Sequence, residues 1–187
     1  MTDRQQRIRP LPERAHELLA AVDAPPRLRA HLELVHDVAA QLLDGLAARW
    51  PQLAVDGEAV RFGAATHDIG KVRHPEELTG PGHAHEPAGA DLLGELGVPP
   101  HDARFARTHA SWHLPGISTE ELLVSLADKI WKNRRQTDLE DLVVARLAAA
   151  SGEPSWEVFL ALDDLLGRLG EDADRRLAHQ AAFPVVG

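Results

Sequence analysis

The stretch "ATHDIGK", residues 65–71, places His67 directly beside Asp68 where the preceding apolar pattern predicts the end of a helix. Neighbouring residues on a helix point about 100° apart, so these two polar side chains cannot both face solvent or both face the core. A metal ion would account for the pair, because the imidazole can bind it from one side and the carboxylate from another, where the carboxylate can also bridge to a second ion. Gly70 then lets the chain turn away. We therefore interpret His67 and Asp68 as candidate metal ligands.

Three further polar residues interrupt apolar helical patterns elsewhere in the chain. His31 lies on an apolar stripe one turn before Val35, His109 comes shortly before Trp112, and Asp128 falls inside "LLVSLADKIW". A buried carboxylate is costly unless a positive group meets it. Because these residues come from separate predicted helices, they suggest one shared cation site in the middle of a helical bundle.

The composition restricts the chemistry and the partners. The chain has 187 residues, enough for one domain, and no cysteine, so a metal must be held by nitrogen and oxygen ligands. The net charge of -9 argues against a protein that coats nucleic acid but leaves a small anionic substrate open. There is no long apolar run and no signal-peptide pattern. We expect a cytoplasmic protein without a membrane or nucleic-acid partner.

Hydrophobic residues recur at three- and four-residue spacings along most of the chain, and strand-like alternation is absent. The pattern predicts an all-α fold, a bundle of seven or eight helices in a single domain over 1–187. The predicted helices cover 26–50, 58–68, 86–97, 99–113, 119–133, 141–150 and 156–180, and 71–85 is predicted to be a loop. Capping boxes are predicted at Ser118 with Glu121 and at Thr137 with Glu140, Asp56 is predicted to cap the helix that begins at about Glu58, and Ser155 is predicted to cap the last segment.

The spaced pattern "HLELVHDVAAQL", "THDIGK", "HEPAGADLL", "THASW" and "LADKI" resembles the HD-domain superfamily of metal-dependent phosphohydrolases. The resemblance covers a core of about 29–135, which leaves C-terminal helices over 137–183. It implies one metal bound by His31, His67, Asp68 and Asp128. It also implies a second metal completed by His85 and His109, with Asp68 bridging the two ions.

Three segments more specifically resemble bacterial symmetrical dinucleoside tetraphosphate hydrolases: "HEPAGADLL", "THASW" and "LADKIWKNR". It implies that Arg134 contacts a phosphate group. The chain departs from that pattern, because Trp131 and Lys132 replace an acidic residue and a proline, and "HASW" stands for the usual "HTTG"-like stretch. The substrate is therefore left open.

Imidazole and carboxylate ligands favour Fe, Mn, Co, Ni or Zn, with Mg as the remaining choice of divalent cofactor. Two such ions would activate a water molecule to attack a phosphate ester or anhydride of a nucleotide or related small molecule. We assign catalytic roles to Asp68, Lys71 and Lys129, and phosphate binding to Lys129 and Arg134. Lys132 and Arg135 either contact phosphate as well or belong to a solvated helix end.

Several alternatives stay open at this level. His83 or His113 could replace His85 or His109 as a ligand. The remaining histidines are expected to face solvent or to pack locally: His16, His36, His74, His101 and His179. The same ligand order also occurs in di-iron oxygenases of the superfamily, and a noncatalytic ligand-binding module is the third interpretation. The leucine-rich C-terminal segment is expected to form core or the face of a homodimer.

Overall fold

The computed structural model describes residues 8–186, and in that range the chain forms nine α-helices, two short 3-10 helices and no strand. The all-α prediction is confirmed. In chain order the elements are α1 (Glu13–Ala21), α2 (Pro26–Arg49), α3 (Gly57–Thr66), η1 (Ile69–Val72), η2 (Pro75–Leu78), α4 (His85–Glu95), α5 (Pro100–Thr108), α6 (Thr119–Ile130), α7 (Thr137–Ser151), α8 (Ser155–Gly170) and α9 (Ala173–Ala181).

The helix count exceeds the predicted seven or eight for two reasons. Helix α1 was not predicted, and the C-terminal segment breaks into α8 and α9 at a turn over 171–172. The predicted helix over 99–113 stops at Thr108, and the predicted loop contains η1 and η2. These differences lie at helix ends and in short segments, where pattern carries the least information.

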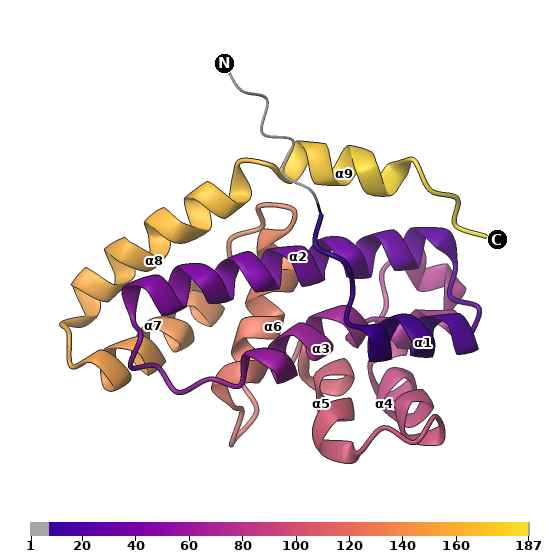
Figure 1. Cartoon of the computed structure of the whole chain (residues 1–187), viewed down its shortest axis with the longest axis horizontal. Helices are drawn as coiled ribbons and strands as arrows, with labels where there is room; N and C mark the ends of the chain where they lie inside the picture. Colours follow the sequence, from indigo (N-terminus) through magenta and orange to yellow (C-terminus); the bar gives the residue numbers. More distant parts are fainter. Residues whose placement is uncertain (1–7, 187) are drawn as a thin grey trace.

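Helix α2 runs through the middle of the molecule and contacts α3, α6, α8 and α9 (Figure 1). It begins with Pro26, whose missing N–H costs nothing in the first turn. Its apolar residues contribute to two separate core clusters. Leu28 and Leu32 pack in one cluster, and the residues from Leu34 onward pack in the other. His31 lies between two residues of the first cluster, Leu28 and Leu32, and three residues before the second cluster begins at Leu34.

Two of the predicted helix caps are present and two are not. Ser118 and Glu121 form the predicted capping box of α6, and the Asp56 side chain accepts hydrogen bonds from the first turn of α3. The box predicted at Thr137 and Glu140 is wrong, because the Glu140 carboxylate is bound instead by the Arg135 guanidinium and the Gln136 N–H. Ser155 does not cap α8 either. The N-cap position is Pro154, and Ser155 is the first helical residue.

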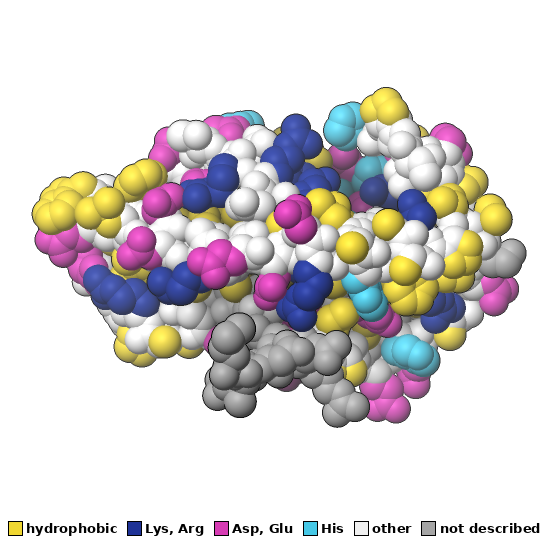
Figure 2. All heavy atoms as spheres, turned by 90° about the horizontal axis from the view of Figure 1, so that it is seen from above, with side chains coloured by type: hydrophobic (Ala, Val, Ile, Leu, Met, Phe, Trp, Pro, Cys, Tyr) yellow, Lys and Arg dark blue, Asp and Glu magenta, His cyan; other side chains and the backbone are white. Residues whose placement is uncertain are grey.

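No helix in the described part of the chain is both long enough and apolar enough to cross a membrane. Large apolar side chains do reach the surface on α8, where Trp156 is 64% exposed, Phe159 43% and Leu160 55%. Figure 2 shows hydrophobic side chains gathered at the left end of the molecule, the end at which α7 and α8 meet in Figure 1. The face of a homodimer, one of the two roles expected for this segment, stays a prediction.

Candidate metal centre

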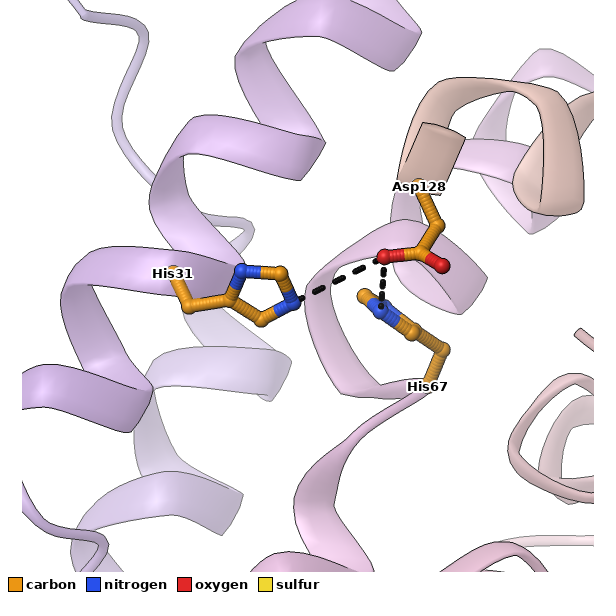
Figure 3. A group of neighbouring side chains, drawn as sticks. All are labelled: His31, His67 and Asp128. Carbon is orange, nitrogen blue, oxygen red and sulfur yellow. Dashed lines mark ion pairs between the residues drawn. The ribbon is translucent and has the colours of Figure 1, made fainter. Parts of the chain in front are cut away.

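Three helices bring His31, His67 and Asp128 together in the interior. His31 comes from α2, His67 follows the last residue of α3, and Asp128 comes from α6 (Figure 3). The Asp128 Oδ1 lies 3.4 Å from Nε2 of His67 and 3.8 Å from Nε2 of His31. All three side chains are buried, and one ligand atom from each can reach a single metal ion.

Asp68 connects this group to a second one, because its two carboxylate oxygens face different histidines. Oδ2 lies 3.1 Å from Nε2 of His31, while Oδ1 lies 3.0 Å from Nε2 of His85 and 3.3 Å from Nε2 of His109. Nε2 of His85 and Nε2 of His109 are 3.3 Å apart. The six residues predicted as ligands thus lie in two adjoining groups that share the Asp68 carboxylate, and their binding of metal stays a prediction.

Gly70 explains how the His67–Asp68 segment comes so close to the helix that carries His85. A Cβ atom on Gly70 would lie 2.0 Å from the carbonyl oxygen of His85 and 2.5 Å from the backbone nitrogen of Gly89. These are backbone atoms that cannot move aside, so only glycine lets η1 pack directly on α4. The prediction that Gly70 allows the chain to turn away missed this close approach.

His67 and His109 are oriented by hydrogen bonds at their outer nitrogens, whereas Nδ1 of His31 has no partner among the described residues. Nδ1 of His67 donates to the carbonyl oxygen of Ala64 at 2.9 Å, and Nδ1 of His109 donates to that of Ala106 at 3.0 Å. This tautomer leaves the Nε2 lone pairs directed inward, as in metal-binding histidines. Nε2 of His31 and of His67 are buried and have no hydrogen-bond partner among residues 8–186. Buried, unpartnered imidazole nitrogens beside carboxylates fit a divalent transition metal.

Glu77 orients the third histidine, and the sequence analysis missed it. Its carboxylate lies 2.5 Å from Nδ1 of His85 and accepts hydrogen bonds from the N–H groups of Ala84 and His85 at 3.0 and 3.1 Å. Burial acts to raise the pKa of Glu77, but these hydrogen bonds lower it to about 2. The residue is therefore ionised and holds the Nδ1 proton of His85. Nothing in the local sequence separates Glu77 from its exposed neighbour Glu76.

The two carboxylates of the site are paired with lysines. Nζ of Lys71 lies 2.6 Å from Asp68 Oδ2, and Nζ of Lys129 lies 2.6 Å from Asp128 Oδ2. Burial opposes ionisation, but His67 and Lys71 hold the pKa of Asp68 well below its usual range, and His67 and Lys129 do the same for Asp128. Burial also lowers the pKa of His31. Ionised carboxylates and a neutral imidazole are the forms that bind a metal.

A polar cavity of 260 Å³ opens beside His31. Its lining includes three basic side chains, Arg27, Lys71 and Lys132, together with Gln180 of α9. Burial, together with neighbouring cations such as Lys129, lowers the pKa of Lys132. The cavity is therefore suited to an anionic group next to the histidine and aspartate cluster.

The other predicted basic residues lie outside this lining. Lys129 contacts Asp128, Arg134 is exposed, and Arg135 pairs with Glu140 and Asp163. Lys132, for which two interpretations were open, is the residue that reaches the cavity. The phosphate role of Arg134 stays a prediction.

The alternative ligands and the other histidines lie apart from the cluster. The His83 side chain is 81% exposed and pairs with Glu86, and the His113 side chain is 68% exposed and pairs with Asp138. His85 and His109 are the ones that lie against Asp68. His36 is buried in α2, whereas the others are exposed or half-buried: His16, His74, His101 and His179.

The fold and the site define an α-helical protein with buried histidine and aspartate groups able to hold divalent metal. The model of the HD domain matches residues 29–133, more than half of the chain, and contains all six predicted ligands. The chain belongs to the HD-domain family. The family is generally one of metal-dependent phosphohydrolases, and its members bind divalent metals.

A curated relative extends beyond the region that this chain matches. The "Multifunctional CCA protein" of Methylococcus capsulatus is 33% identical over 150 residues, which cover 75% of this chain and 34% of that protein. The chain therefore spans about a third of the relative's length. No solved structure matches the chain.

Proposed function

We propose that the protein is a phosphohydrolase that cleaves a phosphate ester or anhydride of a nucleotide or related small molecule with metal-activated water. The observation that carries the proposal is the Asp68 carboxylate, shared between two buried histidine groups and adjoining a cavity with three basic side chains. Family membership supports the class of reaction.

The donor set fits two divalent ions, one near His31, His67 and Asp128 and one near His85 and His109, with Asp68 between them. Metal ions there would supply an activated water and polarise a phosphoryl oxygen. The protein's own contribution is to hold the inward Nε2 atoms in place through the outer Nδ1 hydrogen bonds of His67, His85 and His109.

Charge on the phosphoryl group is met by lysines at the edge of the cluster. Lys71 and Lys129 are each bonded to a site carboxylate, which fixes their ammonium groups beside the proposed ligands. Lys71 also lines the cavity, as does Lys132. Fixed positive charges in a partly buried site stabilise developing negative charge more than they would in water. We assign Lys71 and Lys129 to the reacting phosphate and Lys132 to anionic substrate groups in the cavity, and we retain Arg134 as a candidate to be tested beside them.

The test is phosphate release from a panel of nucleoside monophosphates, diphosphates and dinucleoside tetraphosphates, measured with Mn²⁺, Fe²⁺, Co²⁺ or Ni²⁺. Asp68→Asn keeps the size of the side chain and removes its charge, and the exposed Asp164→Asn is the matched control. We expect turnover in the wild type and in the control, also without oxygen, and loss of both turnover and bound metal in Asp68→Asn. Two bound metals with no phosphate release from any substrate would contradict the proposal, and oxygen-dependent turnover would favour an oxygenase.

A further inference from the structure

Helix α9 lies outside the region matched by the HD-domain model, yet it forms part of the cavity beside His31. The model match ends at residue 133, while α9 covers Ala173–Ala181 and places Gln180 in the cavity lining. In Figure 1, α9 lies over the first half of α2, the part of that helix that carries His31. The cavity is thus built partly by the matched region and partly by a helix outside it.

The position of α9 is fixed at its middle by a buried arginine. Arg176 is 5% exposed, and its guanidinium donates to the carbonyl oxygens of Trp131 and Ile130 at the end of α6 and of Leu169 in α8. These carbonyls lie at helix ends, where donors within the helix run out, although that of Ile130 also accepts from the Asn133 N–H at 2.9 Å. Arg176 therefore fastens α9 to the helix that carries Asp128 and leads into Lys132.

A second set of bonds fixes the end of α9 against the start of α2. Arg27 donates through Nε to the carbonyl oxygen of Phe183 at 3.0 Å and through Nη2 to that of Ala181 at 3.1 Å. Its backbone N–H also donates to the carbonyl oxygen of Pro184 at 3.1 Å. Gln180 lies between the two anchored points, so its backbone is held beside the cavity that the residue lines.

The cavity carries more positive charge than a neutral ligand needs. Arg27 and Lys132 line it without a carboxylate partner among residues 8–186, Lys71 is paired with Asp68, and the acidic residue in the lining, Glu77, is bonded to His85. A half-buried amide among three cations can donate its N–H₂ group to an anion. We infer that this cavity binds an anionic group of the substrate other than the one that is attacked, and that Gln180 contacts that group and selects for it. The inference rests on the proposed function, since it places a second anionic group beside the reacting phosphate.

A charge series at position 180 tests the inference by binding, apart from turnover. The probe is imidodiphosphate, a non-hydrolysable analogue with two linked phosphoryl groups, titrated into the metal-loaded full chain by calorimetry. Gln180→Glu should weaken its binding and Gln180→Lys should tighten it. Each change should be at least roughly fivefold, because a unit charge at contact distance is worth about 1 kcal/mol even in water. The exposed Asp174→Asn, on the same helix, adds the same unit of positive charge as Gln180→Lys.

The outcomes separate this inference from the proposed function. A graded series at position 180 with wild-type binding in Asp174→Asn supports it. Equal affinities in the wild type, Gln180→Glu and Gln180→Lys would overturn it. An Asp174→Asn effect as large as that of Gln180→Lys would overturn it as well. Phosphate release together with a flat series would reject the Gln180 assignment alone. A graded series in a protein that hydrolyses none of the substrates would leave the anion site standing and reject the proposed reaction.

Discussion

Replacing Glu77 by glutamine separates the two halves of the proposed metal centre. Glutamine keeps the length of the side chain but has one oxygen and one N–H₂ group. The native carboxylate accepts from the Ala84 N–H through one oxygen and from the His85 N–H and Nδ1 through the other. In the variant one of these groups must face another donor, and the negative charge that holds the Nδ1 proton of His85 is gone.

We expect the Glu77→Gln substitution to lower the affinity for the metal bound by His85 and His109. Loss of an outer hydrogen-bond partner of a ligating histidine typically weakens metal binding by about 10- to 100-fold, or roughly 1.4 to 2.8 kcal/mol. Glu77 does not contact His31 or His67, whose Nε2 atoms face Asp128 on the other side of Asp68. We therefore expect one metal to be retained and the other to become easily removed.

The measurement is metal content after dialysis against a graded series of a weak chelator, beside a competition titration of affinity. Glu76→Gln is the matched control, because Glu76 is the exposed neighbour of Glu77 on η2. Circular dichroism with temperature checks that both variants fold. Two metals bound with wild-type affinity in Glu77→Gln would refute the orienting role of Glu77 and the assignment of His85 as a ligand.

Three further predictions follow from the same geometry. Gly82→Ala should reproduce the metal loss of Glu77→Gln in a folded protein. The new Cβ would lie 2.1 Å from Glu77 Oε1 and displace that flexible side chain from His85. Unchanged metal content would contradict this prediction. Gly70→Ala should lower the free energy of unfolding by about 1–3 kcal/mol or more in urea titrations, because its Cβ meets backbone of α4, and a neutral result would show that η1 can shift. Burial lowers the pKa of His36 from 6.5 to about 4, so its contribution to stability is complete above pH 6.5 and is lost as the pH falls toward 4. The loss amounts to about 3 kcal/mol, and unfolding titrations at pH 7 and pH 4 should show it in the wild type but not in His36→Leu.

Part of the ligand set could be predicted from the sequence because polar side chains stand at positions where the helical pattern is otherwise apolar. His31 and Asp128 stand on otherwise apolar helical stripes, and such a conflict is visible without knowing what lies opposite. The close approach of His85 to Asp68 could not be derived in the same way, since it depends on how η1 packs on α4. It was available only through the family pattern.

The parts that were missed depend on contacts between distant residues. Glu77 becomes an orienting residue because the loop after η2 returns His85 to it, and its sequence neighbours show nothing of this. The capping box predicted at Glu140 failed because Arg135, whose side chain competes for the same carboxylate, lies outside the motif. The break between α8 and α9 is stabilised by Arg176, which binds the carbonyl at Leu169 from the following helix.

The bonds made by Arg176 also limit how far the metal centre can be treated as a module. The family segment over 29–133 contains every proposed ligand, and on that ground an excised fragment would be expected to bind metal. The same fragment lacks the guanidinium that donates to the carbonyl oxygen of the buried Trp131, three residues after Asp128. The family segment therefore holds every proposed ligand but is not a complete folding unit. All six ligands are present by residue 128, whereas the end of the helix that carries Asp128 is hydrogen-bonded by Arg176 of α9.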